Sequence, residues 1–177
     1  MDLAIRIEDM SGSYPIHSLV ISNFIAMVRW QLRDSKCNVY GDNVKYAFKD
    51  NKGIDRNVIP DASINCHLSS VRGTAFLNAP RFVMEVLSPT TEKYDSGAKK
   101  DLYLSQEVND YWIVDYVKKA VEIWSLDYSE DEPKYVLIKL ISSENADELY
   151  IPTLQHINVS YDDLFYGVDD ALKAMRQ

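Results

Sequence analysis

The sequence predicts an α/β protein in which helices flank a mixed β-sheet. Apolar residues recur about every 3.6 positions over residues 15–34, which is the period of an amphipathic helix. Short apolar or alternating runs at 58–67, 81–88 and 111–116 are typical of strands, and a second helical segment at about 94–106 separates the last two. Helices and strands in this order indicate an α/β domain with a mixed sheet.

Length and composition fit one globular domain. The chain has 177 residues, of which 46% are hydrophobic and 26% charged, so disorder and collagen-like structure are excluded. We expect a single domain over 1–177, because two domains would each be small for a core. Residues 1–2 begin neither a basic nor an apolar segment, so we expect no secretory signal. No uncharged apolar run approaches the roughly 18 residues that a membrane helix needs. Cys37 and Cys66 match no metal-ligand spacing and are too few for a disulfide framework, so a cytoplasmic protein is expected.

The negative charge is concentrated in one part of the chain. The formal net charge is −8, which disfavours a nucleic-acid partner because phosphate contacts are mainly electrostatic. However, residues 127–170 hold 11 Asp and Glu against 2 Lys, whereas residues 1–126 hold 16 Asp and Glu against 15 Lys and Arg. Such an acidic stretch is typical of solvated loops. A local basic surface elsewhere is therefore not excluded.

The first elements in chain order are a helix and two strands. Pro15 suits the first helical position, and Ser13 is a candidate cap. Residues 38–49 alternate well enough for one strand, with a bend near 42–43. Residues 58–67 alternate cleanly and predict the next strand, which a loop follows.

Two buried strands dominate the rest of the chain. Residues 81–88 (RFVMEVLS) and 111–116 (YWIVDY) are apolar runs of the kind found in strands that are covered on both faces. The other predicted elements are the helix at about 94–106, strands at 120–127 and 134–142, a short capped helix from Ser160, and a terminal helix at 169–175.

Glu85 is the most informative candidate for a functional residue. It lies in the middle of the apolar run 81–88. Burying a lone charge costs several kcal/mol of folding free energy. A sequence accepts this cost when the carboxylate meets a cation, a metal or a hydrogen-bond network. The alternative is that Glu85 lies at the end of a sheet and faces solvent.

Asp61 is a second candidate carboxylate. It follows Pro60 on the polar face of the predicted strand 58–67, which could lie next to the strand of Glu85. Two carboxylates on adjacent strands would repel each other unless a divalent cation lay between them, and Mg²⁺ favours such a pair together with several waters. Alternatively, Pro60 and Asp61 simply begin a strand after a turn.

Lys99 and Lys100 lie on the helix that follows the strand of Glu85. The short connection returns this helix across the sheet, so one ammonium group could point toward the carboxylates and stabilise charge that develops on a phosphate. The alternative is an ordinary solvated lysine pair. Successive residues differ by about 100° around a helix, so only one of the two lysines can face such a site.

The same residues form part of a longer recognisable pattern. Pro60-Asp61, the run EVLSPTT from Glu85, Asp95, Lys99, Tyr103 and the run VNDYWIVD ending at Asp115 together resemble the Uma-two family. This family is a branch of the PD-(D/E)XK nuclease superfamily. The resemblance spans about residues 15–166 and is densest over 80–116. It implies a restriction-endonuclease-like fold and metal-dependent hydrolysis of DNA phosphodiester bonds.

The resemblance also assigns roles to individual residues. It implies that Asp61 and Glu85 bind Mg²⁺ or Mn²⁺ together with the backbone carbonyl of Val86, and that Lys99 is the catalytic lysine. Many superfamily members carry that lysine two residues after the acid, where this chain has Leu87. The match therefore places the lysine on the following helix.

Several further residues match the family pattern. His17 corresponds to a histidine of the first helix and could contact metal-bound water or phosphate, although a surface histidine is an equal alternative. Asp115 is an auxiliary candidate that we expect to hold a lysine or a backbone amide. Tyr103 and Trp112 are expected to pack in the core near the site. The usual longer lead-in before the first helix is reduced here to Glu8 and Gly12.

Two functions from different classes remain open, beside a third, the hydrolysis of a small phosphorylated or nucleotide substrate, which needs no basic DNA groove. The first is a metal-dependent DNA endonuclease, which would bind a divalent cation. The second is a binding or assembly module that keeps the nuclease fold without turnover, which the overall acidity favours. The 12 Tyr and 3 Trp residues could supply an interface, so we expect a homo-oligomer, with a dimer favoured.

Overall fold

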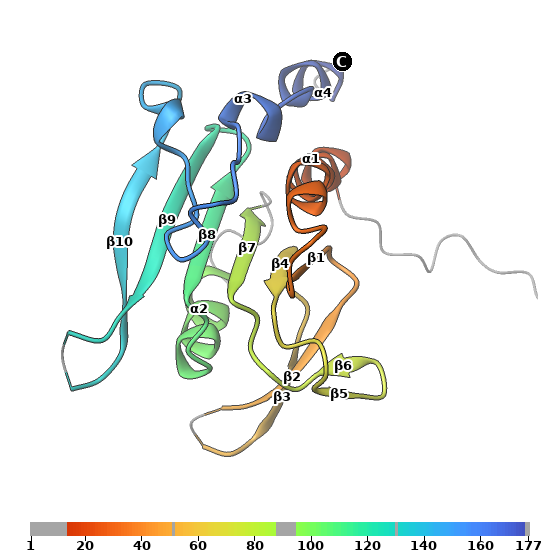
Figure 1. The fold of residues 1–177 in the computed structure, drawn as a ribbon. Coiled ribbons are helices and arrows are strands. Elements are labelled where there is room, and N and C mark those ends of the chain that lie inside the picture. The colour runs from red at the N-terminus through yellow and green to blue at the C-terminus, as the bar shows by residue number, and fades with distance from the viewer. Residues whose placement is uncertain (1–13, 51, 88–94, 130, 176–177) are drawn as a thin grey trace, which may run out of the picture.

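The structure, a computed structural model, describes residues 14–50, 52–87, 95–129 and 131–175. Its centre is a twisted six-stranded sheet with the order β1-β4-β7-β8-β9-β10 (Figure 1). The strands of this sheet are β1 (Asn38–Tyr40), β4 (Ala62–Asn65), β7 (Phe82–Leu87), β8 (Asp110–Asp115), β9 (Ala120–Asp127) and β10 (Lys134–Ile141).

The sheet is mixed because one of its pairings is parallel. β7 and β8 are parallel neighbours, with Glu85 opposite Ile113, and α2 (Asp95–Ser105) lies in the connection between them. All the other neighbours in this sheet are antiparallel. Parallel neighbours require a crossover, so the sequence order strand, helix, strand is what brings α2 onto the sheet next to Glu85.

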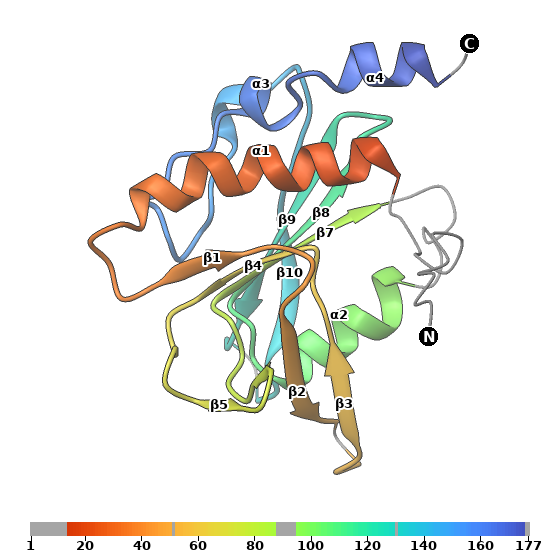
Figure 2. The ribbon, with the colours of Figure 1, turned by 90° about the vertical axis from the view of Figure 1, so that its right-hand side faces the viewer.

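Helices cover the sheet on both faces (Figure 2). α1 (Pro15–Gln31) lies along one face, with α3 (Tyr161–Leu164) and α4 (Val168–Ala174) packed against it, while α2 covers part of the other face. This arrangement confirms the predicted α/β class with helices flanking a central mixed sheet.

The face under α1 carries the larger apolar core. Phe24 of α1 is fully buried and stacks on Phe82 of β7 with ring centroids 5.4 Å apart. Trp112 of β8 closes this cluster at 5.1 Å from Phe82 and 6.0 Å from Phe24. Alternate residues of β7 and β8 face the other way, where Val83 and Tyr111 form the core beneath α2.

A second, four-stranded sheet differs from the prediction of one strand over 38–49. Residues 38–49 form two strands, β1 in the central sheet and β2 (Lys45–Lys49) in the second sheet, and the predicted bend near 42–43 is where the chain passes between them. β2 pairs with β3 (Asp55–Val58) as a hairpin, and the expected loop after residue 67 adds β5 (Val71–Arg72) and β6 (Ala75–Phe76). Alternation predicts strands but not which sheet they join.

The predicted strand 58–67 is also divided. β3 ends at Val58 and β4 begins at Ala62, so Asp61 precedes β4 and does not lie on a strand face. Pro60 has no N–H to donate to a sheet ladder, which accounts for the break. The alternative expectation, in which Pro60 and Asp61 lie at a turn before a strand, describes the structure better.

The two cysteines, which are too few for a disulfide framework, form a single disulfide that the sequence did not predict. Cys37 and Cys66 are bonded to each other. The antiparallel register of β1 with β4 places Asn38 opposite Asn65, and the next pair outward is the two cysteines. Their separation of 29 residues hides this pairing from a reading of the sequence.

The remaining elements follow the sequence closely. Strands at 120–127 and 134–141 and the helix at 95–105 lie within one residue of their predicted bounds, and Ser160 caps α3 through a hydrogen bond from the Asp163 N–H. The first helix ends at Gln31, earlier than predicted. Pro15 occupies its first turn, and Ser13 lies outside the described residues. No helix in the described ranges is long and apolar enough to cross a membrane.

Removing the ring of Phe24 should strongly destabilise the protein, because α1 is fixed to the sheet largely through this side chain. We expect Phe24→Ala to lower the free energy of unfolding by about 3–5 kcal/mol, measured by urea denaturation. Trp30 lies on the same helix with 72% of its surface exposed. Trp30→Ala should therefore change the free energy of unfolding by less than about 0.5 kcal/mol. Equal effects of the two variants would contradict this packing.

Candidate active site

Asp61 lies against β7 at the point where β4 begins. The pairing of β4 with β7 starts with Ala62 opposite Met84, so Val86 lies beyond it. The Asp61 side chain occupies this position, and its Oδ2 accepts a hydrogen bond from the Val86 N–H at 2.7 Å. The bond fixes one carboxylate beside the residue that directly follows Glu85.

Glu85 is almost fully buried, with 3% of its surface exposed. Two side chains of α2 contact its carboxylate: Lys99 Nζ donates to Oε2 at 2.9 Å, and Tyr103 OH donates to Oε1 at 2.6 Å. Residues four positions apart share one helix face, so a single face of α2 provides both donors. The alternative that Glu85 faces solvent is therefore wrong.

The environment of Glu85 changes its acidity. Burial disfavours the carboxylate and raises the pKa of Glu85 to about 7, although the positive charge of Lys99 opposes this shift. The negative charge of Asp61, which is bonded to the N–H of the residue after Glu85, adds to the increase. The carboxyl groups of Asp61 and Glu85 and the ammonium group of Lys99 therefore lie together where β4, β7 and α2 meet.

The two lysines of α2 have different surroundings. Lys99 contacts Glu85, whereas Lys100 Nζ lies 2.9 Å from the ring centroid of Trp124 on β9. The indole N–H of Trp124 in turn donates to Glu122 Oε2 at 2.8 Å. The divergence follows from the rotation of about 100° between successive helical residues. The structure therefore places the lysine that the spacing selects, Lys99, at the carboxylate.

His17 reaches Asp61 from the first turn of α1. Its Nε2 lies 3.1 Å from Asp61 Oδ2, and 12% of the side chain is exposed, so His17 is not a surface histidine. Burial lowers the pKa of His17, but the hydrogen bond and charge of Asp61 outweigh this effect and raise the pKa above its usual value. Its Nδ1 is buried without a hydrogen-bond partner in the described part of the chain.

Asp115 and Trp112 are not brought to this cluster. Asp115 ends β8, where its Oδ1 accepts hydrogen bonds from the N–H groups of Val117 and Lys118, and its Oδ2 pairs with Lys118 Nζ at 2.9 Å. These contacts shape the turn into β9. Trp112 packs on the α1 face of the sheet, opposite to Glu85, because neighbouring strand residues point to opposite faces.

Tyr103 has a more direct contact than the sequence indicates. The sequence places it in the core near the site, but its hydroxyl donates to Glu85. Burial and the Glu85 charge raise the pKa of Tyr103 well above its ordinary value, so it remains a hydrogen-bond donor. The spacing of four residues from Lys99 is the signal that could have identified this contact.

The oxygen atoms at this point suit a hard divalent cation. Asp61 Oδ1 accepts no hydrogen bond from the described residues, and its Oδ2 is already held in position. In an extended strand the N–H and carbonyl of one residue point to the same side, so the Val86 carbonyl faces Asp61. Two carboxylates and a carbonyl are ligands that Mg²⁺ and Mn²⁺ accept. The described ranges contain no group of three or more His, Cys, Asp or Glu side chains that could hold a metal ion.

Comparisons with known proteins place the chain in a family. The model of the Uma2 family, described as "putative restriction endonuclease", matches residues 6–160. An uncharacterized protein of Synechocystis sp., slr1290, is 24% identical over 143 residues, which cover 80% of this chain and 72% of that protein. A solved structure from Anabaena variabilis, described as a "putative nuclease belonging to DUF820", matches with a TM-score of 0.65 and 17% identity over 90% of this chain and 84% of that chain.

These findings define the class and then the family. The central mixed sheet flanked by helices is a nuclease-like α/β fold, shared with the Anabaena structure. The family model covers most of the chain, and the protein therefore belongs to the Uma2 family.

The raised pKa of Glu85 predicts a pH dependence of stability. Because the folded pKa of about 7 exceeds the ordinary value of 4.5, the stabilisation linked to the protonated form is complete below pH 4.5 and is lost as the pH rises to about 7. In Glu85→Gln this loss should be absent. We expect the free energy of unfolding of the variant, relative to wild type, to rise between pH 4.5 and 7 in urea titrations with a chelator. A difference that does not change with pH would contradict the assignment.

Proposed function

We propose that this protein is a metal-dependent endonuclease that hydrolyses phosphodiester bonds of DNA. The observation that carries the proposal is the convergence of three elements on one point: Asp61 before β4, Glu85 on β7 and Lys99 on α2. Membership of a family described as restriction endonucleases supports it. Phosphodiester hydrolysis needs little beyond a positioned water and stabilisation of negative charge on the phosphate.

Asp61, Glu85 and the Val86 carbonyl are the groups that would hold Mg²⁺ or Mn²⁺. A cation bound there would act as a Lewis acid and lower the pKa of a bound water. The protein positions Asp61 through the Val86 N–H and His17, so the carboxylate is oriented before any substrate arrives. Tyr103 similarly fixes the rotamer of Glu85. Such preorganisation lowers the cost of assembling the site.

Lys99 would contribute positive charge next to the reacting phosphate. The side chain of Lys99 is 27% exposed, so solvent and substrate can reach it while its Nζ is bonded to the buried Glu85. An ammonium at this position can orient the attacking water or stabilise the pentavalent phosphate oxygens. The bond to Glu85 keeps the long lysine side chain in one conformation.

One observation favours the alternative of a non-catalytic module. Both oxygens of Glu85 already have donors, Lys99 and Tyr103, so the carboxylate is compensated without a metal. The net charge of −8 also limits the attraction of a long duplex. Such a module would keep the fold of the family and would not cleave DNA under any metal condition.

The expected homo-oligomer is supported by the edge of the central sheet. β10 is the last strand in the sheet order, and it exposes three large apolar side chains, those of Leu137, Ile138 and Leu140. Long apolar edge strands tend to pair with another chain. A dimer therefore remains part of the proposal. A cytoplasmic location is retained from the sequence, and the Cys37–Cys66 disulfide, a bond that is rare in reducing compartments, argues against it.

Plasmid nicking tests the proposed activity. Glu85→Ala should reduce nicking in Mn²⁺ or Mg²⁺ by at least about 10²-fold, and Lys99→Met by about 10²–10⁴-fold. Lys100→Met is the matched control, since Lys100 contacts Trp124 and not Glu85, and it should nick like wild type. Nicking that persists unchanged in Glu85→Ala would refute the proposal.

A further inference from the structure

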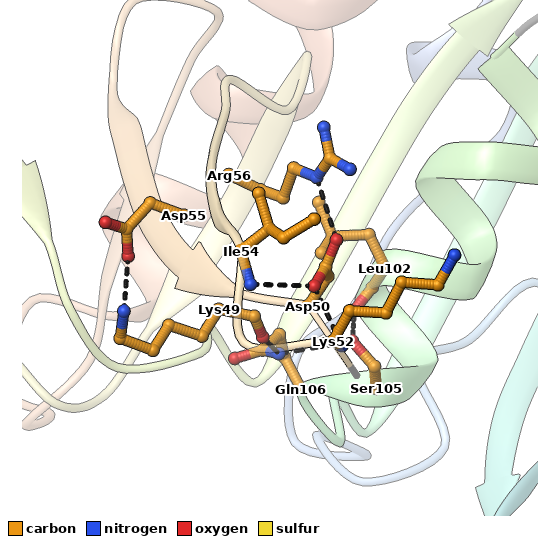
Figure 3. A network of polar contacts seen from close by, with 9 residues as sticks. All are labelled: Lys49, Asp50, Lys52, Ile54, Asp55, Arg56, Leu102, Ser105 and Gln106. Carbon is orange, nitrogen blue, oxygen red and sulfur yellow. Dashed lines mark hydrogen bonds and ion pairs between the residues drawn. The ribbon is translucent and has the colours of Figure 1, made fainter.

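A pocket of about 790 Å³ lies between the β2–β3 hairpin and α2. This volume falls within the roughly 300–1,000 Å³ of small-ligand sites. Its wall on the hairpin side includes Lys52, Ile54 and Arg56, and its wall on the helix side includes Lys99 and Leu102. Figure 3 shows that the hairpin end lies directly beside the last turns of α2.

The hairpin wall is ordered by its own hydrogen bonds and is joined to the helix side by one more, so the pocket is preformed. Asp50 accepts hydrogen bonds from the N–H groups of Lys52 and Ile54 and from Arg56 Nε at 3.0 Å (Figure 3). Gln106, just after α2, donates to the carbonyl of Lys49 at 2.7 Å and thereby joins helix to hairpin. A preformed cavity of this kind can bind a ligand without the entropy cost of ordering its walls.

Lys99 belongs both to this pocket and to the cluster around Glu85. It lines the pocket, and its Nζ is bonded to Glu85 Oε2 at 2.9 Å. A molecule that fills the pocket therefore lies next to the proposed reaction centre. Because the two sites share one side chain, the pocket is placed to hold the part of a substrate adjacent to the bond that is cleaved.

The lining combines an apolar surface with a few polar and charged groups. Ile54 and Ile59 are 49% and 42% exposed, unusual for isoleucine, and Val58, Ala98 and Leu102 continue the apolar surface. Asn57 presents an amide that can both donate and accept hydrogen bonds. Such a lining suits a flat, largely apolar ring with polar edges.

The charges of the lining suit the phosphate backbone of a single nucleic-acid strand. Lys52, Arg56 and Lys99 oppose Asp50 and Asp101, so the pocket is slightly positive in a chain whose net charge is −8. Arg56 is paired with Asp50, whereas the ammonium group of Lys52 has no partner among the described residues. Lys52 is thus the cation most available to a phosphate.

We propose that this pocket binds an unpaired nucleobase of the DNA strand, next to the phosphate that would be cleaved at the cluster of Asp61, Glu85 and Lys99. The inference rests on the proposed nuclease function and extends it to the strand state of the substrate. A base within a duplex is stacked and paired, so its faces can contact the apolar wall of this open pocket only from a single strand or after the base is flipped out. Contact of the base with the aliphatic side chains of the pocket supplies affinity that does not depend on sequence.

Fluorescence anisotropy with a labelled 12-nucleotide strand, alone or in a duplex, tests this inference in EDTA, where no cleavage occurs. We expect wild type to bind the single strand at least about tenfold more tightly than the duplex. Ala98→Trp, which fills the pocket from an exposed helix position, should weaken single-strand binding about tenfold. Ala174→Trp, an exposed alanine on α4, should leave binding unchanged.

A second pair of variants tests the phosphate contact. Lys52→Ala should weaken single-strand binding several-fold, whereas Lys49→Ala should not, because Lys49 is paired with Asp55 on the same hairpin and does not line the pocket. Thermal unfolding establishes that each variant is folded. If Ala98→Trp is unfolded, Ile54→Glu provides the same test from the hairpin wall.

The outcomes distinguish this inference from the proposed catalysis. Equal binding of single strand and duplex, with no effect of Ala98→Trp or Ile54→Glu, would overturn the inference even if Glu85-dependent nicking is found. Loss of single-strand binding in Ala98→Trp, together with no cleavage of plasmid or of single strands by wild type, would support the pocket and refute the catalytic proposal. Loss of both binding and single-strand cleavage in Ala98→Trp would support both.

Discussion

The buried carboxylate of Glu85 is the constraint on which the site depends. A carboxylate on a central strand is costly unless cations and donors compensate it, and here Lys99 and Tyr103 do so from one face of α2. The same contacts fix the position of α2 relative to β7. The packing of the helix and the geometry of the proposed reaction centre are therefore consequences of one interaction.

Asp61 depends on a different feature, the place where β4 begins. Because β4 starts at Ala62, the N–H of Val86 would lack a strand partner, and the Asp61 side chain provides one. His17 of α1 then contacts Asp61 from the opposite face of the sheet. Groups from both faces thus meet at one strand end, which explains how three distant segments of the chain form one cluster.

The sequence predicts the parts of this cluster that are close along the chain. Glu85 and Lys99 lie on a strand and the helix directly after it, so apolar pattern and helical spacing are enough to associate them. Tyr103 follows from the same spacing, although its hydrogen bond does not. In contrast, the face on which Trp112 lies depends on strand register, which reverses with a shift of one residue.

The features that the sequence did not predict are long-range. The division of 38–49 between two sheets and the Cys37–Cys66 bond both depend on which strands pair. Local periodicity contains no information about such partners. For the same reason, the pocket between the β2–β3 hairpin and α2 could not be anticipated: its walls come from segments about fifty residues apart, as Lys49 and Gln106 show.

Calorimetric titration of Mn²⁺ into the metal-free protein tests the central claim, that Asp61 and Glu85 form one cation site, most directly. Wild type should bind one ion, and Asp61→Asn and Glu85→Gln should each weaken binding by at least about tenfold. Glu122→Gln is the matched control, because Glu122 lies in the same row of the sheet as Glu85, across Ile113, and bonds to Trp124. Binding that is equally strong in wild type and in both site variants, or absent from wild type, would contradict the account.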